Sequence, residues 1–307
     1  MSGGARGPGK GRSGRGRSGG KPGGGKAGGG KPGGGAGGRG ARSERPGPSA
    51  PRPSGRPSQR PIRQEPAGDG ASDTVVYGRN AVAEALRARR RRVHRVWATA
   101  GAAREPWLAG ARVPVAVVDS DEVQRRASSD AHQGVCARVD PYPYADAGGF
   151  LRGEAPLIVA LDEVQDPQNL GAICRTAECV GADGVVICER RAVQVTAAVA
   201  KASAGAVEHL PIARVRNLAD FLLEAREAGA WSYGAAAAPG AIPYTQPDWS
   251  GGVVLVLGAE GRGLRPRVAS ACDALVALPL RGRIASLNVS AAAAALLYGI
   301  LHRRGGS

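Results

Sequence analysis

The pattern of apolar and polar positions changes at about residue 75. From there on, short apolar runs alternate with segments whose apolar residues recur at helical spacing. Strands are expected at 75–77, 93–97, 113–118 and 134–139. Between them, helices are expected near 102–108 and 120–127, and after the first strand an amphipathic helix carries Val82, Ala85 and Leu86 on one face. These elements predict a small α/β domain over 73–140.

A second region, 156–307, alternates more regularly. Its apolar runs predict strands at 157–161, 185–188, 209–213, 231–234, 253–257 and 275–278. Helices are expected at 170–180, 195–204, 218–228 and 287–303. Near-continuous apolar strands separated by helices favour a parallel sheet covered on both faces. The residues between the two regions, 141–155, include Pro141 and Pro143 and read as a linker, because the residue before a proline favours extended backbone.

Residues 1–72 lack any such periodicity. They carry 15 of the 42 basic and 3 of the 26 acidic residues, and therefore 12 of the 16 net positive charges, together with 25 of the 48 glycines. A segment with so few apolar side chains buries too little surface to offset the entropy of ordering, so disorder is expected. We interpret it as an electrostatic arm that neutralises phosphates, with a solubilising tail as the alternative. A GxGxxG match at 35–40 follows no strand and is discarded.

Composition excludes several other classes. The longest apolar stretch, near 291–301, is shorter than the roughly 18 residues of a membrane helix. The five cysteines are odd in number, show no CxxC spacing and suggest neither a disulfide framework nor a zinc site. No cluster of His, Cys and Asp with metal-ligand spacing is present, so no metal is expected. The expectation is a cytoplasmic protein with polyanionic partners.

Three loops of the second region carry candidate chemistry, because ligands of parallel sheets bind at the carboxyl ends of strands. The first contains Asn169, expected as a helix cap, and Arg175. The second, after the strand at 253–257, surrounds Glu260 with glycines that let backbone approach a ligand. The third contains Ser286 and Asn288 before the last helix. Each loop taken alone also fits an ordinary cap, salt bridge or tight turn.

In this order and spacing, the three loops resemble the three motifs of the SpoU/TrmH family of RNA ribose 2'-O-methyltransferases. The resemblance spans 157–303 and includes the stretch 201–211. The region 75–139 resembles the ribosomal-L30e-like substrate-binding domain of the same family. The combination is most similar to members that modify a guanosine in the peptidyl-transferase loop of 23S rRNA.

The resemblance implies an α/β fold whose parallel sheet contains a C-terminal trefoil knot, dimerisation through that knot, and an active site beside the dimer interface. It implies S-adenosylmethionine as methyl donor, held by Gly258, Leu278 and Leu287 largely through main-chain groups, and RNA (23S rRNA or a ribosomal precursor) as partner. The polar catalytic positions of the family match Asn169, Arg175, Glu260, Ser286 and Asn288. One position departs from the family pattern: Tyr298 is followed by Gly299, where the family usually has Glu.

The reaction constrains these roles. The family proposal makes Arg175 the base or activator of the 2'-hydroxyl, but a guanidinium with a pKa above about 12 is normally a donor only. Arg175 is therefore either strongly perturbed or a phosphate clamp, whereas Glu260 is expected to orient Asn169 or Arg175, and Ser286 and Asn288 to fix the loop and contact substrate. Two alternatives stay open: a methyltransferase of tRNA or another rRNA site, and a non-catalytic ribosome-binding factor.

Overall fold

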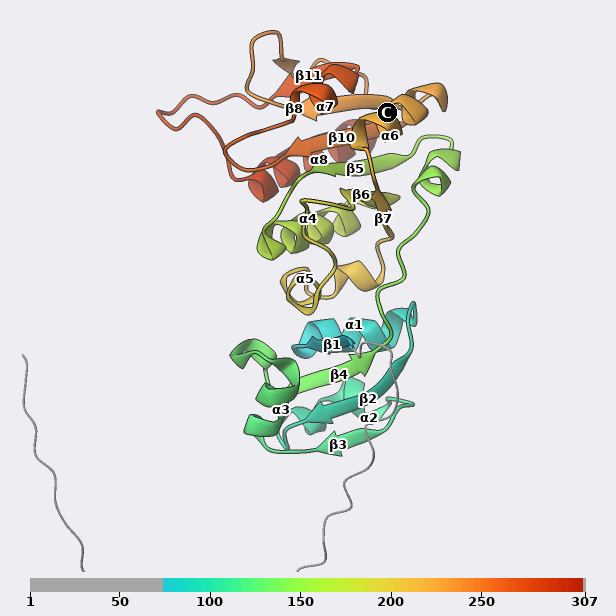
Figure 1. The fold of residues 1–307 in the computed structure, drawn as a ribbon, viewed down its shortest axis with the longest axis vertical. Helices are drawn as coiled ribbons and strands as arrows, with labels where there is room; N and C mark the ends of the chain where they lie inside the picture. Colours follow the sequence, from blue (N-terminus) through green and yellow to red (C-terminus); the bar gives the residue numbers. More distant parts are fainter. Residues whose placement is uncertain (1–73, 306–307) are drawn as a thin grey trace, which may run out of the picture. The chain divides into compact units, whose positions relative to one another are not determined.

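The computed structural model describes residues 74–305, and the predictions made for residues 1–72 lie outside this part of the chain. The described chain contains one four-stranded and one seven-stranded sheet (Figure 1). In this part of the chain, no helix is long and apolar enough to cross a membrane.

The four-stranded sheet has the strand order β1-β4-β2-β3 and is formed by β1 (Thr74–Tyr77), β2 (Val93–Ala98), β3 (Val115–Val117) and β4 (Val135–Val139). Strand β4 is antiparallel to β1 and β2, and β2 is parallel to β3. Helix α1 (Arg79–Ala88) buries Val82 and Ala85 as the pattern predicted, and α3 (Ser120–Ala127) is capped by Asp119, which accepts a hydrogen bond from the Glu122 amide.

The helix expected near 102–108 is divided into η1 (Ala102–Arg104) and α2 (Pro106–Ala109). The cause is Pro106, which disfavours helical backbone at the residue before it, so that Glu105 is extended with φ −63° and ψ 130°. A further short helix, η2 (Asp130–His132), precedes β4.

The seven-stranded sheet has the order β7-β6-β5-β10-β8-β11-β9, and every neighbouring pair is parallel. Its strands are β5 (Leu157–Asp162), β6 (Gly184–Cys188), β7 (Ile212–Val215), β8 (Trp231–Ala235), β9 (Ile242–Pro243), β10 (Val253–Gly258) and β11 (Ala274–Ala277). The prediction of an α/β fold with a parallel sheet is confirmed.

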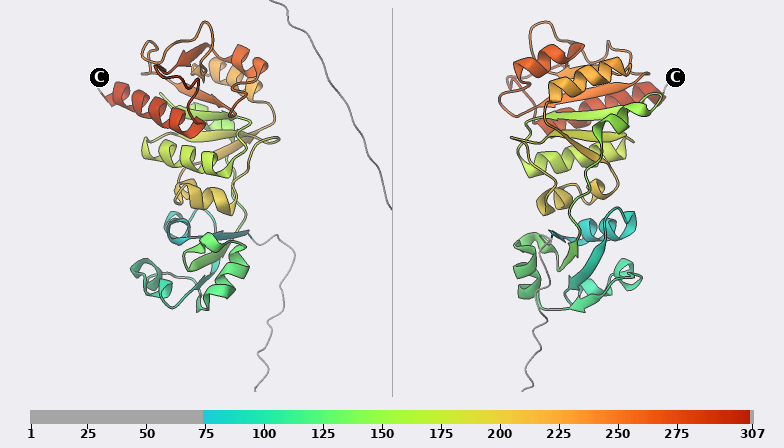
Figure 2. Two further views of the ribbon diagram at one scale, coloured as in Figure 1. Left: turned by 90° about the vertical axis from the view of Figure 1, so that its left-hand side faces the viewer. Right: turned by 45° about the vertical axis from the view of Figure 1, so that its right-hand side comes forward.

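Helices cover both faces of this sheet. Alternate residues of β5 and β10 face opposite ways: Leu157 and Leu255 join the core beneath α4 (Pro167–Cys179), α5 (Ala197–Ala202) and α8 (Val289–Gly305), while Ile158 and Val254 join the core beneath α6 (Leu218–Glu227) and α7 (Pro266–Ala271). Helix α8 packs beside α4 (Figure 2). Both faces of the central strands are buried, which explains why these strands read as continuous apolar runs.

Some boundaries differ from the predicted ones. Strand β7 begins at Ile212 rather than 209, because η4 (Ala206–Glu208) continues after Gly205, whose φ of +88° ends α5. Helix α5 is capped by Thr196 and is shorter than expected. The predicted linker contains η3 (Ala147–Arg152), and β9 was not predicted.

Candidate active site

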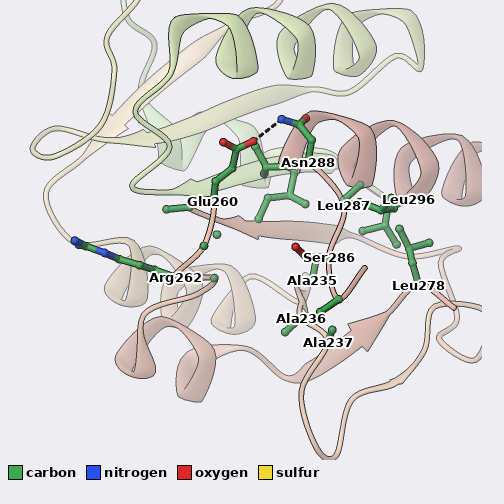
Figure 3. A pocket seen from close by; sticks show the side chains of 18 of the residues that line it. Ala235, Ala236, Ala237, Glu260, Arg262, Leu278, Ser286, Leu287, Asn288 and Leu296 are labelled. Atoms are coloured by element: carbon green, nitrogen blue, oxygen red, sulfur yellow. Dashed lines mark hydrogen bonds between the residues drawn. The ribbon is translucent and has the colours of Figure 1, made fainter. Parts of the chain in front are cut away.

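A pocket of about 520 Å³ opens at the carboxyl ends of β10, β8 and β11 (Figure 3). Its walls come from three segments that are distant in sequence: the residues after β10, the alanines at 235–237 at the end of β8, and residues of the segment 278–288 that connects β11 to α8. Leu278, Leu287 and Leu296 form an apolar wall, whereas Glu260, Ser286 and Asn288 supply polar groups. The size is that of a pocket for a small ligand, for which volumes of about 300–1000 Å³ are usual.

The loop after β10 folds back on its own strand at Gly258. A Cβ atom at this position would lie 2.2 Å from the carbonyl carbon of Gly263, so no side chain fits there without moving backbone. The Gly263 amide donates to the Ala259 carbonyl oxygen at 2.9 Å, and Gly261 and Gly263 both have positive φ. The three glycines therefore permit a tight turn that holds Glu260 at the pocket rim.

Asn288 joins the last helix to this loop. Its Oδ1 accepts from the amides of Ser290 at 2.9 Å and Ala291 at 3.3 Å, which caps the start of α8. Its Nδ2 donates to the Asn169 Oδ1 at 3.0 Å and to the Glu260 carboxylate. Asn288 thus serves both as the cap expected from sequence and as the centre of a polar cluster.

Asn169 is placed differently from the prediction. The cap of α4 is Asp166, whose carboxylate accepts from the Gln168 amide at 2.9 Å, and Pro167 occupies the first helical position. Asn169 therefore lies inside the first turn, 6 % exposed, with its side chain committed to Asn288 rather than to the backbone. A smaller cavity of about 280 Å³ adjoins the main pocket here and shares Glu260 and Arg262 with it.

An ion pair between a partly exposed arginine and a buried carboxylate fixes the loop after β10 from the other side. The Arg265 Nε donates to the Asp162 carboxylate at 2.7 Å, and the Arg265 amide donates to the same carboxylate at 2.8 Å. The Asp162 side chain is fully buried at the end of β5. The hydrogen bond with Asp162 raises the pKa of Arg265, although burial by itself would lower that pKa. The pair ties the ends of two adjacent strands together.

Most predicted site residues gather at this one edge of the sheet. Glu260, Ser286, Asn288, Gly258, Leu278 and Leu287 line the main pocket, and Asn169 lines the adjoining cavity.

Arg175 lies apart from them. It is exposed in the second half of α4, lines neither cavity and has no ion-pair partner among residues 74–305. Glu260 was expected to orient Asn169 or Arg175; its carboxylate accepts from Asn288, which links it indirectly to Asn169 and not to Arg175.

Sequence reasoning missed three features of the site. The alanines at 235–237 line the pocket and were signalled only by their place after a strand of a parallel sheet. Arg262 borders both cavities, with its side chain directed away from the other labelled groups (Figure 3). Asp162 could have been noticed as a carboxylate at the end of an apolar run, but nothing in the sequence indicates that its partner is Arg265, about a hundred residues away.

The departure at position 299 has a local explanation. Gly299 lies on α8 against the ring of Tyr244, where a Cβ atom would be 2.9 Å from the Tyr244 Cε2. A glutamate at this position would require the tyrosine to move. Within the described residues, no group of His, Cys, Asp and Glu side chains is arranged to hold a metal ion.

The fold and site define an α/β protein with a parallel seven-stranded sheet and a polar cluster beside a partly apolar ligand pocket. Comparisons with known proteins show to which family such a protein belongs. The family described as SpoU rRNA Methylase matches residues 156–298. The family described as RNA 2'-O ribose methyltransferase substrate binding matches residues 75–145.

Two relatives are similar over most of their length. The Putative TrmH family tRNA/rRNA methyltransferase YacO of Bacillus subtilis is 45% identical over 178 residues, which cover 56% of this chain and 71% of the relative. A Putative TrmH family tRNA/rRNA methyltransferase of Staphylococcus haemolyticus is 36% identical, with 76% of this chain and 96% of the relative covered.

Among solved structures, an AdoMet-bound rRNA methyltransferase of Sinorhizobium meliloti is similar with a TM-score of 0.65 and 28% identity, covering 75% of this chain and 87% of that one. The chain belongs to the SpoU/TrmH family of RNA methyltransferases.

Proposed function

We propose that the protein transfers a methyl group from S-adenosylmethionine to a ribose 2'-hydroxyl of RNA, most specifically a guanosine in the peptidyl-transferase loop of 23S rRNA. The observation that carries the proposal is the cluster of Asn288, Glu260 and Asn169 at the rim of a pocket that is lined by the glycine-rich turn after β10. Membership of the SpoU family and the AdoMet-bound relative of Sinorhizobium meliloti support it.

The pocket fits the proposed donor. Leu278, Leu287 and Leu296 offer an apolar wall for the adenine ring, and the absence of a side chain at Gly258 lets the backbone at Gly263 fold against it, which shapes the turn that lines the pocket. The Glu260 carboxylate supplies negative charge near a cationic sulfonium. When bound, S-adenosylmethionine supplies an electrophilic methyl group. Gly258, Leu278 and Leu287 would hold it through the three loops that form the walls.

The polar cluster acts by orientation. The side chain of Asn288 forms hydrogen bonds with the start of α8, with Asn169 and with Glu260. Its side-chain amide is therefore held in one orientation before substrate binds, and no further conformational entropy is lost on binding. Glu260 is the acceptor that holds this amide, and Ser286 lines the same pocket from the segment that leads into α8, two residues before Asn288. We assign Asn288, Asn169 and Ser286 to positioning the ribose, and Glu260 to orienting Asn288 rather than to taking the proton.

Arg175 belongs to the proposed site through a second copy of the chain. It is exposed and lies outside the pocket of its own chain, and its guanidinium suits the phosphate next to the reacting ribose because it can donate two parallel hydrogen bonds to it. We propose a homodimer, formed through a C-terminal trefoil knot, in which Arg175 of one copy serves the pocket of the other. Arg175 then clamps the phosphate or activates the 2'-hydroxyl.

The region that contains the four-stranded sheet is assigned to substrate choice. Its match to the substrate-binding family supports an RNA ligand, and we propose that it acts as an L30e-like domain at 73–140, followed by a linker at 141–155 and the methyltransferase domain at 156–307. A cytoplasmic location is proposed, and residues 1–72 are assigned to non-specific contacts with RNA phosphates.

Two RNA classes are separated by one experiment. Purified protein is incubated with S-adenosylmethionine carrying a labelled methyl group and either unmodified 23S rRNA or unmodified tRNA, and incorporation into each is counted. We expect label in the rRNA. Label in tRNA alone would show that tRNA is the substrate and would leave the proposed reaction unchanged. The relatives of Bacillus subtilis and Staphylococcus haemolyticus are named tRNA/rRNA methyltransferases, and this name includes both substrates. Cofactor binding without transfer to either RNA contradicts the proposed substrates, and absent cofactor binding favours a non-catalytic ribosome-binding factor.

A further inference from the structure

A second, strongly basic cavity lies in the region that contains the four-stranded sheet. It has a volume of about 1150 Å³ and lies at the end of α1, the start of β2, and α2 with the loop that follows it (Figure 1). Six arginines line it, and the only carboxylate among its lining residues is Asp140. We call it the arginine groove; its arginines are Arg87, Arg89, Arg90, Arg91, Arg92 and Arg112.

Three of these arginines have structural roles. Arg91 forms a buried ion pair with Glu208, and Arg87 pairs with Glu84 one turn earlier on α1. Arg90 donates to the His209 carbonyl oxygen at 3.3 Å and lies over the Tyr142 ring. These contacts hold the three residues at the groove, and a carboxylate offsets the charges of Arg87 and Arg91 but not that of Arg90.

The other three, Arg89, Arg92 and Arg112, are exposed and form no ion pair with any carboxylate of residues 74–305. The lone carboxylate of the groove is already engaged: Asp140 bonds to the His94 Nε2 at 2.6 Å, and this hydrogen bond lowers the pKa of Asp140. Asp140 also interacts electrostatically with Arg92, so, of these three, the positive charges that no carboxylate of the described residues offsets are those of Arg89 and Arg112.

Helix stabilisation does not account for this arrangement. A cation near the end of α1 interacts favourably with the helix dipole, but the effect is confined to the last turn. Arg112 comes from the loop between α2 and β3 and has no share in it. Bringing Arg112 to a run of arginines instead costs repulsion between like charges, which a bound anion offsets.

We propose that the arginine groove binds the backbone phosphates of the RNA substrate; the inference rests on the proposed RNA substrate and not on the methyl-transfer chemistry. Arginine suits this ligand because its planar fork donates two parallel hydrogen bonds to a phosphate. The groove is larger than the usual small-molecule pocket of about 300–1000 Å³, so it accommodates several linked nucleotides. Phosphate contacts of this kind position an RNA without reading its sequence.

The test compares two triple variants of the full chain that lose the same charge. The groove variant is Arg89→Gln, Arg92→Gln and Arg112→Gln. The control variant is Arg125→Gln, Arg152→Gln and Arg267→Gln, which changes exposed arginines that do not line the groove. Binding of a fluorescent RNA stem-loop is measured by anisotropy from low to high salt, and S-adenosylmethionine affinity is measured by calorimetry as a check on folding of the methyltransferase region.

We expect the groove variant to bind the stem-loop more weakly than wild type and to reduce the slope of log affinity against log salt by about 2, because each lost phosphate contact removes about 0.7–0.9 from it. The control variant keeps the wild-type slope, and both variants keep their cofactor affinity. Equal slopes in the groove variant and wild type overturn the proposal, as does an equal loss in the control. Either result leaves methyl transfer by the wild-type protein unaffected, so the two proposals fail separately.

A single substitution, Arg112→Glu, tests the same assignment with one change, in case the triple variant does not fold. It places a carboxylate in the groove at an exposed loop position. A weaker complex with the stem-loop supports the assignment, and unchanged binding contradicts it.

Discussion

The side-chain amide of Asn288, the residue that caps α8, donates a hydrogen bond to the carboxylate of Glu260 in the loop after β10. The bond links two segments that lie 28 residues apart in sequence and that both line the main pocket. Because Asn288 also donates to Asn169 at the start of α4, the orientation of its amide depends on both acceptors.

The first prediction follows from this bond. Glu260→Gln retains an oxygen acceptor for Asn288, so turnover should fall by no more than about fivefold, corresponding to about 1 kcal/mol for loss of the charged partner. Glu260→Ala removes the acceptor and should cost about 1–3 kcal/mol in transition-state stabilisation. Methyl transfer under single-turnover conditions measures both. A Gln variant as inactive as the Ala variant would instead assign proton transfer to Glu260.

The second prediction concerns the floor of the pocket. Gly258→Ala should abolish measurable S-adenosylmethionine binding, because its Cβ would lie 2.2 Å from the Gly263 carbonyl carbon and displace the loop. Gly282→Ala is the matched control, since a Cβ there meets nothing within 4 Å and its φ is not positive. Calorimetric titration of both proteins gives the answer. Wild-type affinity in Gly258→Ala would exclude this turn from the cofactor site.

The third prediction tests the assignment of Arg175. Arg175→Ala should lower turnover by orders of magnitude with little change in cofactor affinity, because the residue lies outside the pocket of its own chain. Arg175→Lys should keep substantial activity if the residue is a phosphate clamp, since lysine also supplies a cation.

Mixing the variants shows which copy supplies Arg175. Arg175→Ala and Glu260→Ala, each of lowered activity alone, should together reach about a quarter of wild-type activity after subunit exchange, because half the dimers are mixed and each contains one intact composite site. No recovery despite demonstrated exchange would place Arg175 and Glu260 in the site of the same chain.

The fourth prediction is a pH dependence of stability at Asp273. Burial works against ionisation, but the Ser232 hydroxyl at 2.7 Å, the Ser232 amide at 2.8 Å and the Arg226 guanidinium outweigh it, so the pKa of Asp273 is lowered. Stability from this group is therefore present above the unfolded-state pKa of about 3.9 and is lost as the pH falls through the lower folded-state value.

Asp273→Asn should consequently lower the free energy of unfolding by about 1–3 kcal/mol at pH 7, with a difference that shrinks below about pH 4. Urea unfolding at a series of pH values measures this. Asp220→Asn, which removes the partner of the exposed Arg267, is the control and should have a smaller effect. A difference for Asp273→Asn that is constant across the acid range would contradict the assignment.

The sequence predicted the strands well for a physical reason. Residues of β5 and β10 are buried on both faces, so each appears as an unbroken apolar run that polar loops terminate. The gathering of Glu260, Ser286 and Asn288 at one edge follows from the parallel arrangement of the strands.

What the sequence did not predict depends on tertiary contacts. The start of α4 was misplaced because Asn169 and Asp166 are both good caps, and only the packing of α8 against α4 shows that Asn169 is used elsewhere. The pairing of Asp162 with Arg265 joins residues about a hundred positions apart and has no local signature. The isolation of Arg175 from the pocket likewise depends on which side of α4 faces the sheet.

The central claim is transfer of a methyl group to a ribose of rRNA. The most direct measurement is mass spectrometry of the nucleosides released from 23S rRNA after incubation with the protein and S-adenosylmethionine, with the modified position mapped by resistance to alkali. We expect a single 2'-O-methylguanosine in the peptidyl-transferase loop, absent with Arg175→Ala. A methyl group on a base, or rRNA that stays unmodified although the cofactor binds, would contradict it.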